Sequence, residues 1–292
     1  MLGLSVIIVT SIFVIEMNTS EKQTKIHQSA SPSCHHTGQQ EITSDRWIAL
    51  TGQPNVGKSL LFNRLTGSKV AVSNYPGTTV AVDRGQLVIG TEKYDIWDLP
   101  GMYSLLPITE EERVAKQSVL LNKPSFILHV VDARNLKRML PLAMELSETG
   151  LRVILVVNMM DEAEKEGISI DTEKLSRETG IPVVPTVAVT GKGINQILKH
   201  ILNYQRNNHH NVIPFENTIE ERMGNLQKLL DGQYPVHGRS LAQLLMQNDE
   251  DAREMVKKAQ PENYEAIRGI VEDTRKAVDE SLLYLIKIRI HN

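Results

Sequence analysis

A glycine-rich segment has the residue types and the spacing that hold a chain of phosphates. It matches the pattern G-x-x-x-x-G-K-[ST] and runs Gly52, Gln53, Pro54, Asn55, Val56, Gly57, Lys58, Ser59, with Leu60 next. Backbone N–H groups of such a loop turn toward the phosphates, and the N-terminus of the following helix adds positive potential. We expect Lys58 to reach the β- and γ-phosphates and the Ser59 hydroxyl to ligate Mg²⁺. A chance Gly-Lys-Ser turn is the alternative.

A second motif follows about 40 residues after the lysine and is expected to contact the metal and the terminal phosphate. It consists of Asp98, Leu99, Pro100 and Gly101, directly after the apolar run 94–97. A carboxylate at a strand end can hold Mg²⁺ through a water molecule. We expect the Gly101 N–H to meet the γ-phosphate and to sense its loss.

Two further segments have the chemistry to recognise a base. Asn158, Met159 and Asp161 follow the buried run 153–157. A carboxylate accepts two hydrogen bonds from the N1–H and 2-amino groups of guanine, and adenine cannot supply that pair. The alternative role of Asp161, a helix N-cap, is compatible with this one. In a weaker fourth segment, Val187, Ala188 and Val189, we expect the Ala188 N–H to contact the guanine O6, with Val187 in place of the usual Ser.

The loop before residue 86 is the expected switch that responds to the γ-phosphate. Its segment 74–80 contains Gly77, Thr78 and Thr79. One threonine hydroxyl should cap Mg²⁺ when the γ-phosphate is present; we favour Thr79, with Thr78 as the alternative. A glycine beside a proline suits a loop that refolds between two states.

The residue after Gly101 is Met102, where Ras-like proteins have a glutamine that orients the attacking water. An apolar side chain cannot do this, so we expect slow hydrolysis of GTP to GDP unless another group assists. Asn55 is a candidate K⁺ ligand near the phosphates, or equally a structural loop residue. The expected catalytic groups are therefore Lys58, Asn55, Thr79 and Gly101.

The elements that must position these residues are short apolar runs alternating with segments of helical period. The runs are 48–50, 86–89, 94–97, 126–131, 153–157 and 183–187. This alternation predicts an α/β fold, a P-loop NTPase G domain with a mostly parallel sheet flanked by helices. The four-residue turn 90–93 predicts a hairpin and hence one antiparallel strand. After about residue 204 only helical periods remain, which predicts a small all-α domain.

Composition and charge limit the classes of function. The 292 residues carry a net charge of −3 without a basic block, so we expect no nucleic-acid partner. The single Cys34 fits a reducing compartment. We expect an apolar N-terminal segment with a flexible linker (1–45), a GTP-binding domain (46–205) and a helical domain (215–292). The apolar run 1–15 is a weak anchor, a buried or partner-bound segment, or a stretch without function.

Several longer strings resemble one family, the ferrous iron transport protein B (FeoB) family. They are Asn74-Tyr75-Pro76-Gly77-Thr78-Thr79-Val80, Asp98-Leu99-Pro100-Gly101-Met102-Tyr103-Ser104-Leu105 and Val130-Val131-Asp132-Ala133-Arg134-Asn135-Leu136, the last similar to the family's V-V-D-A-x-N-L. Residues 47 to about 200 resemble its G domain, and the stretch from Tyr234 to Asp249 more faintly resembles its helical domain.

The resemblance implies a GTPase with GTP/GDP and Mg²⁺, acting as the switch for ferrous iron uptake through a membrane component. It implies a cytoplasmic chain at the inner face of the cell membrane, whose helical domain stabilises the GDP state and relays switch motion to a pore. No apolar run reaches spanning length, so we expect the pore to be elsewhere, in a split system or beside a stand-alone regulator. The alternatives are a ribosome-assembly or tRNA-modification GTPase and a GTP-dependent scaffold with incidental hydrolysis. A homo-oligomer is left open.

Overall fold

A computed structural model describes residues 46–67, 70–75, 78–204, 214–215 and 217–277 of the chain. The expectations for the N-terminal segment 1–45 with Cys34, and for Gly77 in the switch, lie outside these residues. Among the described residues, none of the helices combines the length and the apolar character that a membrane crossing needs.

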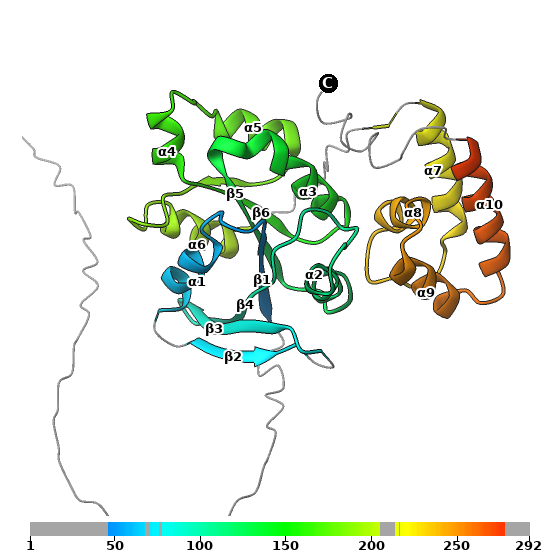
Figure 1. The fold of residues 1–292 in the computed structure, drawn as a ribbon, viewed down its shortest axis with the longest axis horizontal. Helices are drawn as coiled ribbons and strands as arrows, with labels where there is room; N and C mark the ends of the chain where they lie inside the picture. Colours follow the sequence, from blue (N-terminus) through cyan, green and yellow to red (C-terminus); the bar gives the residue numbers. More distant parts are fainter. Residues whose placement is uncertain (1–45, 68–69, 76–77, 205–213, 216, 278–292) are drawn as a thin grey trace, which may run out of the picture. The chain divides into compact units, whose positions relative to one another are not determined.

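One sheet of seven strands forms the centre of the G domain (Figure 1). The strands are β1 (Trp47–Gly52), β2 (Val70–Asn74), β3 (Ala81–Ile89), β4 (Glu92–Asp98), β5 (Phe126–Asp132), β6 (Val153–Asn158) and β7 (Val183–Pro185). Their order is β2-β3-β4-β1-β5-β6-β7. All pairs from β4 to β7 are parallel, and β3 is antiparallel to both neighbours. The expected α/β fold with one reversed strand is therefore confirmed.

The inner strands are continuous apolar runs because helices cover both faces of the sheet. Every residue of β1, β5 and β6 is buried, as expected for a parallel sheet enclosed on two sides. Figure 1 shows α1 (Lys58–Thr66) and α6 (Ile194–Leu202) on one face and α2 (Glu110–Leu121) and α3 (Leu136–Glu148) on the other. The remaining helices of this part are α4 (Met160–Lys165) and α5 (Thr172–Thr179).

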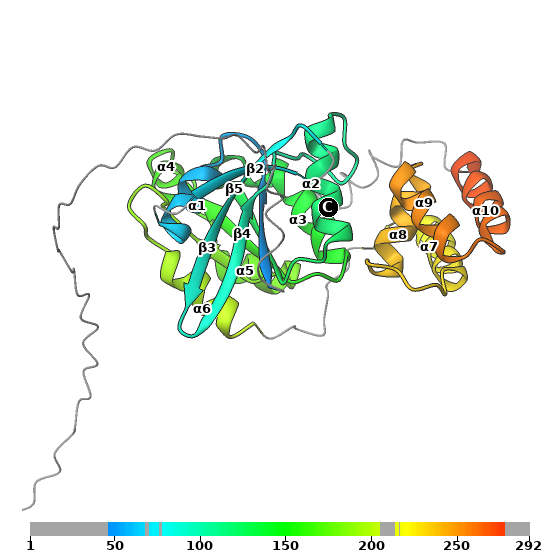
Figure 2. The same cartoon turned by 90° about the horizontal axis from the view of Figure 1, so that it is seen from below.

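Strand β2 is absent from the predicted runs. It pairs with β3, from Val70 opposite Gly85 to Asn74 opposite Ala81, and extends the hairpin side of the sheet (Figure 2). The sequence pattern assigns the end of this strand to the switch loop. Its alternation of Val70 and Val72 with smaller residues is too short to stand out, and Val72 is 70% exposed, so the strand lacks the buried apolar run that identifies the others.

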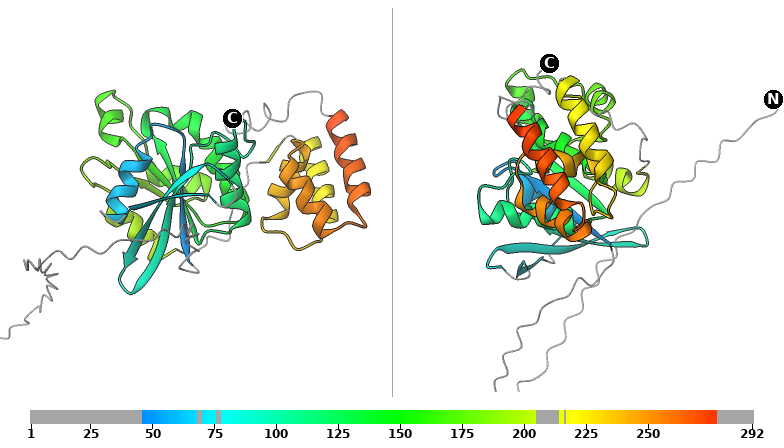
Figure 3. Two further views of the ribbon diagram at one scale, coloured as in Figure 1. Left: turned by 60° about the horizontal axis from the view of Figure 1, so that its bottom comes forward. Right: turned by 90° about the vertical axis from the view of Figure 1, so that its right-hand side faces the viewer.

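The described residues of the C-terminal part form α7 (Asn217–Leu229), α8 (Gly238–Met246), α9 (Glu250–Ala259) and α10 (Tyr264–Ala277). Figure 3 shows these helices packed against one another. Their shared core includes Met223, Leu241 and Val256, all fully buried. The all-α prediction for this part is confirmed.

A buried ion cluster joins α2 to the start of α9. The Lys116 side chain is 1% exposed, and its Nζ donates to Asp249 and, at 2.7 Å, to Asp251 Oδ2. Asp249 also caps α9 by accepting the Ala252 N–H at 2.9 Å. Burial acts to raise the pKa of Asp251, but the hydrogen bond and charge of Lys116, the hydrogen bond of Gln117 and the charge of Arg113 together outweigh it, and the pKa is lowered.

Candidate guanine-nucleotide site

The phosphate loop lies between the end of β1 and the first residue of α1. Its Gly57 is the N-cap of α1 with φ 83°, a backbone conformation that glycine adopts without strain. A Cβ atom on Gly57 would lie 2.3 Å from Asn158 Nδ2. The glycine therefore serves two purposes, the turn into the helix and the close approach of Asn158 at the end of β6.

Lys58, Ser59 and Asp98 form one polar cluster at the adjacent ends of β1 and β4. The Lys58 Nζ donates to Asp98 Oδ1 and, at 2.6 Å, to the Leu99 carbonyl oxygen. The Ser59 hydroxyl donates to Asp98 Oδ2 at 2.9 Å. Strands β1 and β4 are parallel neighbours, with Leu50 opposite Asp98, so the first and second motifs meet because their strands end at the same edge.

This cluster fits a magnesium ion. The Ser59 hydroxyl and the Asp98 carboxylate are hard oxygen donors within hydrogen-bond distance of each other, and Mg²⁺ prefers such ligands together with phosphate oxygens and water. Lys58 supplies the positive charge that a phosphate chain needs. The two threonines of the switch differ: Thr78 Oγ1 donates to the Tyr75 carbonyl oxygen at 3.1 Å, whereas Thr79 is exposed.

Asn158 connects three segments of the site at once. Its Nδ2 donates to the Val56 carbonyl oxygen of the phosphate loop at 2.9 Å. Its Oδ1 accepts the Ala188 N–H at 2.9 Å and the Thr186 hydroxyl at 3.2 Å. The side chain is buried. The Ala188 amide that is expected to meet the guanine O6 thus already has an acceptor, and a guanine would share or exchange that hydrogen bond.

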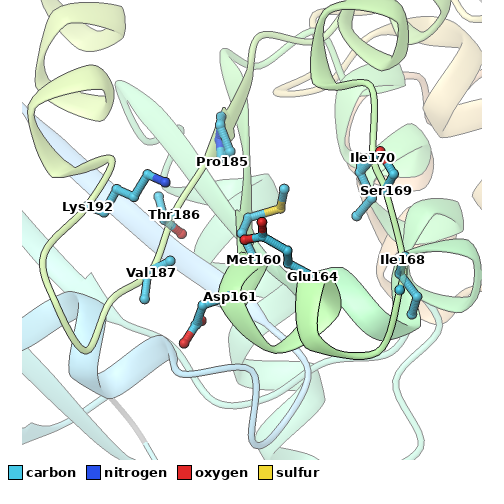
Figure 4. A pocket seen from close by; sticks show the side chains of 11 residues that line it. Met160, Asp161, Glu164, Ile168, Ser169, Ile170, Pro185, Thr186, Val187 and Lys192 are labelled. Atoms are coloured by element: carbon cyan, nitrogen blue, oxygen red, sulfur yellow. The ribbon is translucent and has the colours of Figure 1, made fainter.

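Asp161 lies in the first turn of α4. The N-cap residue of this helix is Met159, whose φ is 62°. A pocket of about 570 Å³ lies beside it. Figure 4 shows this pocket between α4 with the segment Ile168–Ile170 on one side and the segment Pro185–Lys192 on the other. The Asp161 side chain is 44% exposed, so its carboxylate is accessible to a base.

Sequence reasoning missed Arg64, at the end of α1. Its Nε donates to the Ala188 carbonyl oxygen at 3.2 Å, and its Nη2 donates to the Val189 carbonyl oxygen. These two carbonyls belong to the segment expected to face the guanine O6. No local pattern identifies this arginine, because its partners follow it by 124 and 125 residues.

The positions expected to act on the γ-phosphate have distinct surroundings. Met102 is fully buried, so it is part of the core rather than a group beside the attacking water. A Cβ on Gly101 would lie 2.9 Å from the Pro54 ring, which places the second motif against the phosphate loop. Asn55 is exposed and has φ 65°, a left-handed conformation that asparagine tolerates better than most residues.

Comparison with known proteins identifies the family. The sequence model described as "Ferrous iron transport protein B" matches residues 46–201, and the one described as "FeoB cytosolic helical domain" matches residues 215–289. The chain belongs to the FeoB family. It is 36% identical over 196 residues to the Fe(2+) transporter FeoB of Escherichia coli K12, covering 66% of this chain and 25% of that protein. It is 47% identical over 141 residues to FeoB of Helicobacter pylori 26695, covering 48% and 22%.

Solved FeoB structures share this fold. A mutant S. thermophilus NFeoB bound to GDP matches with a TM-score of 0.76 and 30% identity, covering 85% of this chain and 97% of that one. The cytosolic domain of L. pneumophila FeoB matches with 0.73 and 32%, covering 84% and 96%. This FeoB-family chain spans about a quarter of the length of the E. coli relative. It has the FeoB G domain followed by the FeoB helical domain.

Proposed function

We propose that this chain hydrolyses GTP with Mg²⁺ and acts as the switch for ferrous iron uptake through a membrane component, at the inner face of the cell membrane. Its working parts are a G domain (46–205) and a helical domain (215–292). Lys58, Ser59 and Asp98 bind the phosphates and Mg²⁺, and Asn158 with Asp161 selects guanine. Thr79 is the proposed switch ligand of Mg²⁺.

The observation that carries this proposal is the convergence of four distant motifs on one end of the sheet. The Lys58 ammonium and the Ser59 hydroxyl both contact Asp98, and Asn158 contacts both the phosphate loop and the Ala188 segment. A structural ion pair would explain the first contact alone. It would not explain why the base-recognition segment closes on the same loop.

The test is nucleotide binding and turnover by the full chain. We expect GDP and GTP to bind in the presence of Mg²⁺, and ADP and ATP to bind at least about 100-fold more weakly, because adenine leaves the Asp161 carboxylate unpaired. We expect phosphate release from GTP to be slow, and to be lost in Lys58→Ala. Equal binding of adenine and guanine nucleotides would contradict the proposal.

We further propose that Asn55 ligates K⁺ beside the phosphates, where the cation offsets charge that develops during hydrolysis. Its exposed position in the phosphate loop supports this role, and buried Met102 leaves the water-orienting role unfilled at that position. GTP turnover in K⁺ buffer should exceed turnover in Na⁺ buffer several-fold, and Asn55→Ala should lose that gain. Equal rates in both salts would instead point to a catalytic group from a partner protein.

The iron-uptake role rests on family membership and needs its own test. In cells that depend on this chain for ferrous iron, uptake of labelled Fe²⁺ should fall when Lys58→Ala replaces the wild type. Normal uptake with a variant that no longer binds GTP would contradict the switch role. The basic RNA-binding surface expected of a ribosome-assembly GTPase has no support in the mixed charges of α7–α10.

A further inference from the structure

Arg134 holds together the ends of β5 and α4 from a position outside the nucleotide motifs. It lies in a single 3₁₀ turn, Ala133–Asn135, directly after β5. Its Nε and Nη2 donate to the two carboxylate oxygens of Asp132, at 3.1 Å and 2.9 Å. Its Nη1 pairs with Glu162 Oε2 at 2.7 Å and lies 3.7 Å from Glu166 Oε1. The arginine thus joins a buried carboxylate to two carboxylates at α4.

Its partners on α4 are neighbours of the base-recognition residues. Glu162 directly follows Asp161, and Arg134 Nη2 also lies 3.5 Å from the Sδ of Met159, directly after Asn158. One side chain therefore contacts residues next to both polar groups that we assign to guanine recognition. The string V-V-D-A-x-N-L leaves the position of Arg134 open, so the resemblance to the family assigns it no role.

Helix α4 needs such an external contact to keep its place. It has only six residues, and its N-cap Met159 makes no side-chain capping bond and has φ 62°. A helix this short gains little stability from its own hydrogen bonds, and a left-handed methionine costs conformational energy that its surroundings must offset. The Arg134 guanidinium is planar, and two hydrogen bonds to Asp132 hold it in place. It therefore presents a rigid positive charge to Glu162 on α4.

We propose that Arg134 is a positioning residue for guanine selection: by fixing α4 against the end of β5, it aims the Asp161 carboxylate at the N1–H and 2-amino edge of the base. This inference rests on the proposed nucleotide function. Arg134 does not contact the nucleotide in this proposal; it acts through Glu162 and Met159.

The electrostatics of the cluster support the geometry. Burial acts to raise the pKa of Asp132, but hydrogen bonds from Arg134 and Asn135 together with the Arg134 charge lower it. The hydrogen bonds to Asp132 raise the pKa of Arg134. Both groups therefore keep their charges across the physiological range.

The test compares binding of GDP and IDP by calorimetry. Hypoxanthine lacks the 2-amino group, so the dissociation constant of IDP divided by that of GDP reports how well Asp161 is aimed. We expect Arg134→Ala to reduce this ratio about 3- to 10-fold, chiefly by weakening GDP, as charged hydrogen bonds at a partly exposed site allow. Arg134→Lys should give a smaller reduction, because an ammonium keeps the charge but cannot make the two-pronged contact.

The matched control is Arg268→Ala. Arg268 is also an arginine with two glutamate partners on a helix, Glu265 at 2.8 Å and Glu272 at 3.6 Å, but it lies in α10. The dissociation constant of IDP divided by that of GDP should be the same for this variant as for the wild type. Glu162→Gln keeps the Asp132 contact and provides a milder variant, with an expected reduction between those of wild type and Arg134→Ala.

Three outcomes would overturn the inference. If Arg134→Ala weakens GDP and IDP equally, Arg134 has only a general structural role. If Arg134→Ala is unfolded, the inference fails when Arg134→Lys and Glu162→Gln both retain the wild-type ratio. If the wild type itself does not bind GDP, the proposed function fails first, and the measurement on the wild type alone identifies that case.

Discussion

Asn158 Oδ1 accepts the Ala188 backbone N–H at 2.9 Å, across 30 residues of sequence. The nitrogen of the same side-chain amide donates to the Val56 carbonyl oxygen. The base side of the site and the phosphate side are therefore joined through one buried side chain. Its surroundings are close enough that a single Cβ atom added at Gly57 would lie 2.3 Å from its Nδ2.

Gly57→Ala should abolish tight nucleotide binding. The added Cβ would approach Asn158 Nδ2 to 2.3 Å, so Asn158 would have to leave its hydrogen bonds. Gly167→Ala is the matched control, because Gly167 has a similar φ of 76° and nothing within 4 Å of its added Cβ. Each variant should lose about 1 kcal/mol of stability from backbone strain. Only Gly57→Ala should lose GDP affinity, measured by calorimetry; equal affinities of the two variants would refute the close-contact explanation.

Asp161→Asn should change the base preference from guanine to xanthine. The amide NH₂ can donate to the C2 carbonyl oxygen of xanthine, whereas the guanine 2-amino group loses its acceptor. We expect GDP affinity to fall about 100-fold or more and XDP to become the tighter ligand. The measurement is competition between GDP and XDP. Lys165→Ala is the control, since Lys165 lies 3.8 Å from Asp161 Oδ2 and is 76% exposed; retained guanine preference in Asp161→Asn would contradict the assignment.

His129 should make the fold less stable in acid. Burial lowers its pKa to about 4, and its Nδ1 lies 3.0 Å from the Thr51 hydroxyl oxygen. Between about pH 6.5 and pH 4 the unfolded state binds a proton that the folded state excludes, so the free energy of unfolding falls as pH falls. The loss is at most about 3 kcal/mol.

The measurement is denaturant unfolding at several pH values, followed by the fluorescence of Trp47 and Trp97, which are both buried. In His129→Gln the dependence on pH between 6.5 and 4 should become flatter. His200→Gln, on helix α6, should keep the wild-type slope. An unchanged slope in His129→Gln would show that other groups cause the acid sensitivity.

Lys116→Met should destabilise the chain by roughly 3 kcal/mol, because it leaves buried Asp249 without its cation, whereas partly buried Asp251 keeps Arg113 at 3.5 Å. The lowered pKa of Asp251 also predicts a pH dependence of the stability. The stability that Asp251 contributes is fully present above the pKa of this carboxyl in the unfolded chain, and it is lost as the pH falls through the lowered pKa of the folded state. Lys257→Met, on an exposed side of α9, should be nearly neutral. Thermal unfolding of both variants checks the difference, and equal melting temperatures would rule out a stabilising cluster.

Sequence patterns predict the nucleotide site better than the parts that support it. The four motifs carry fixed spacings and strand-end positions, so the sequence predicts Lys58, Asp98 and Asn158 for one site, and the fold brings these residues to neighbouring positions. The apolar runs identify six of the seven strands because these strands carry enough apolar residues in a row to stand out from the sequence around them. Gly77 lies outside the described residues, and the nucleotide and metal roles of all the site residues, Thr79 and Asn55 included, stay predictions.

The supporting contacts are not predictable in this way, because they join residues far apart in sequence through side chains of ordinary type. In the sequence, Arg64 and Lys116 are indistinguishable from solvent-exposed charges on a helix, because their partners lie more than 120 residues further along the chain. Helix α2 is hard to recognise although it begins with a capping box at Thr109 and Glu112, because its many charged residues obscure its buried face. Strand β2 is missed because it is short and lies at the sheet edge.

Helix α1 has a consequence for how the two ends of a nucleotide are sensed. Lys58 begins this helix at the proposed phosphate site, and Arg64 near its other end holds the backbone of the Ala188 segment. About 9 Å of helix rise separates the two residues, so α1 is a spacer of fixed length between the proposed phosphate and base sites. A ligand that shifts one end of this spacer would shift the other, so its affinity would depend on the whole nucleotide rather than on separate phosphate and base contacts.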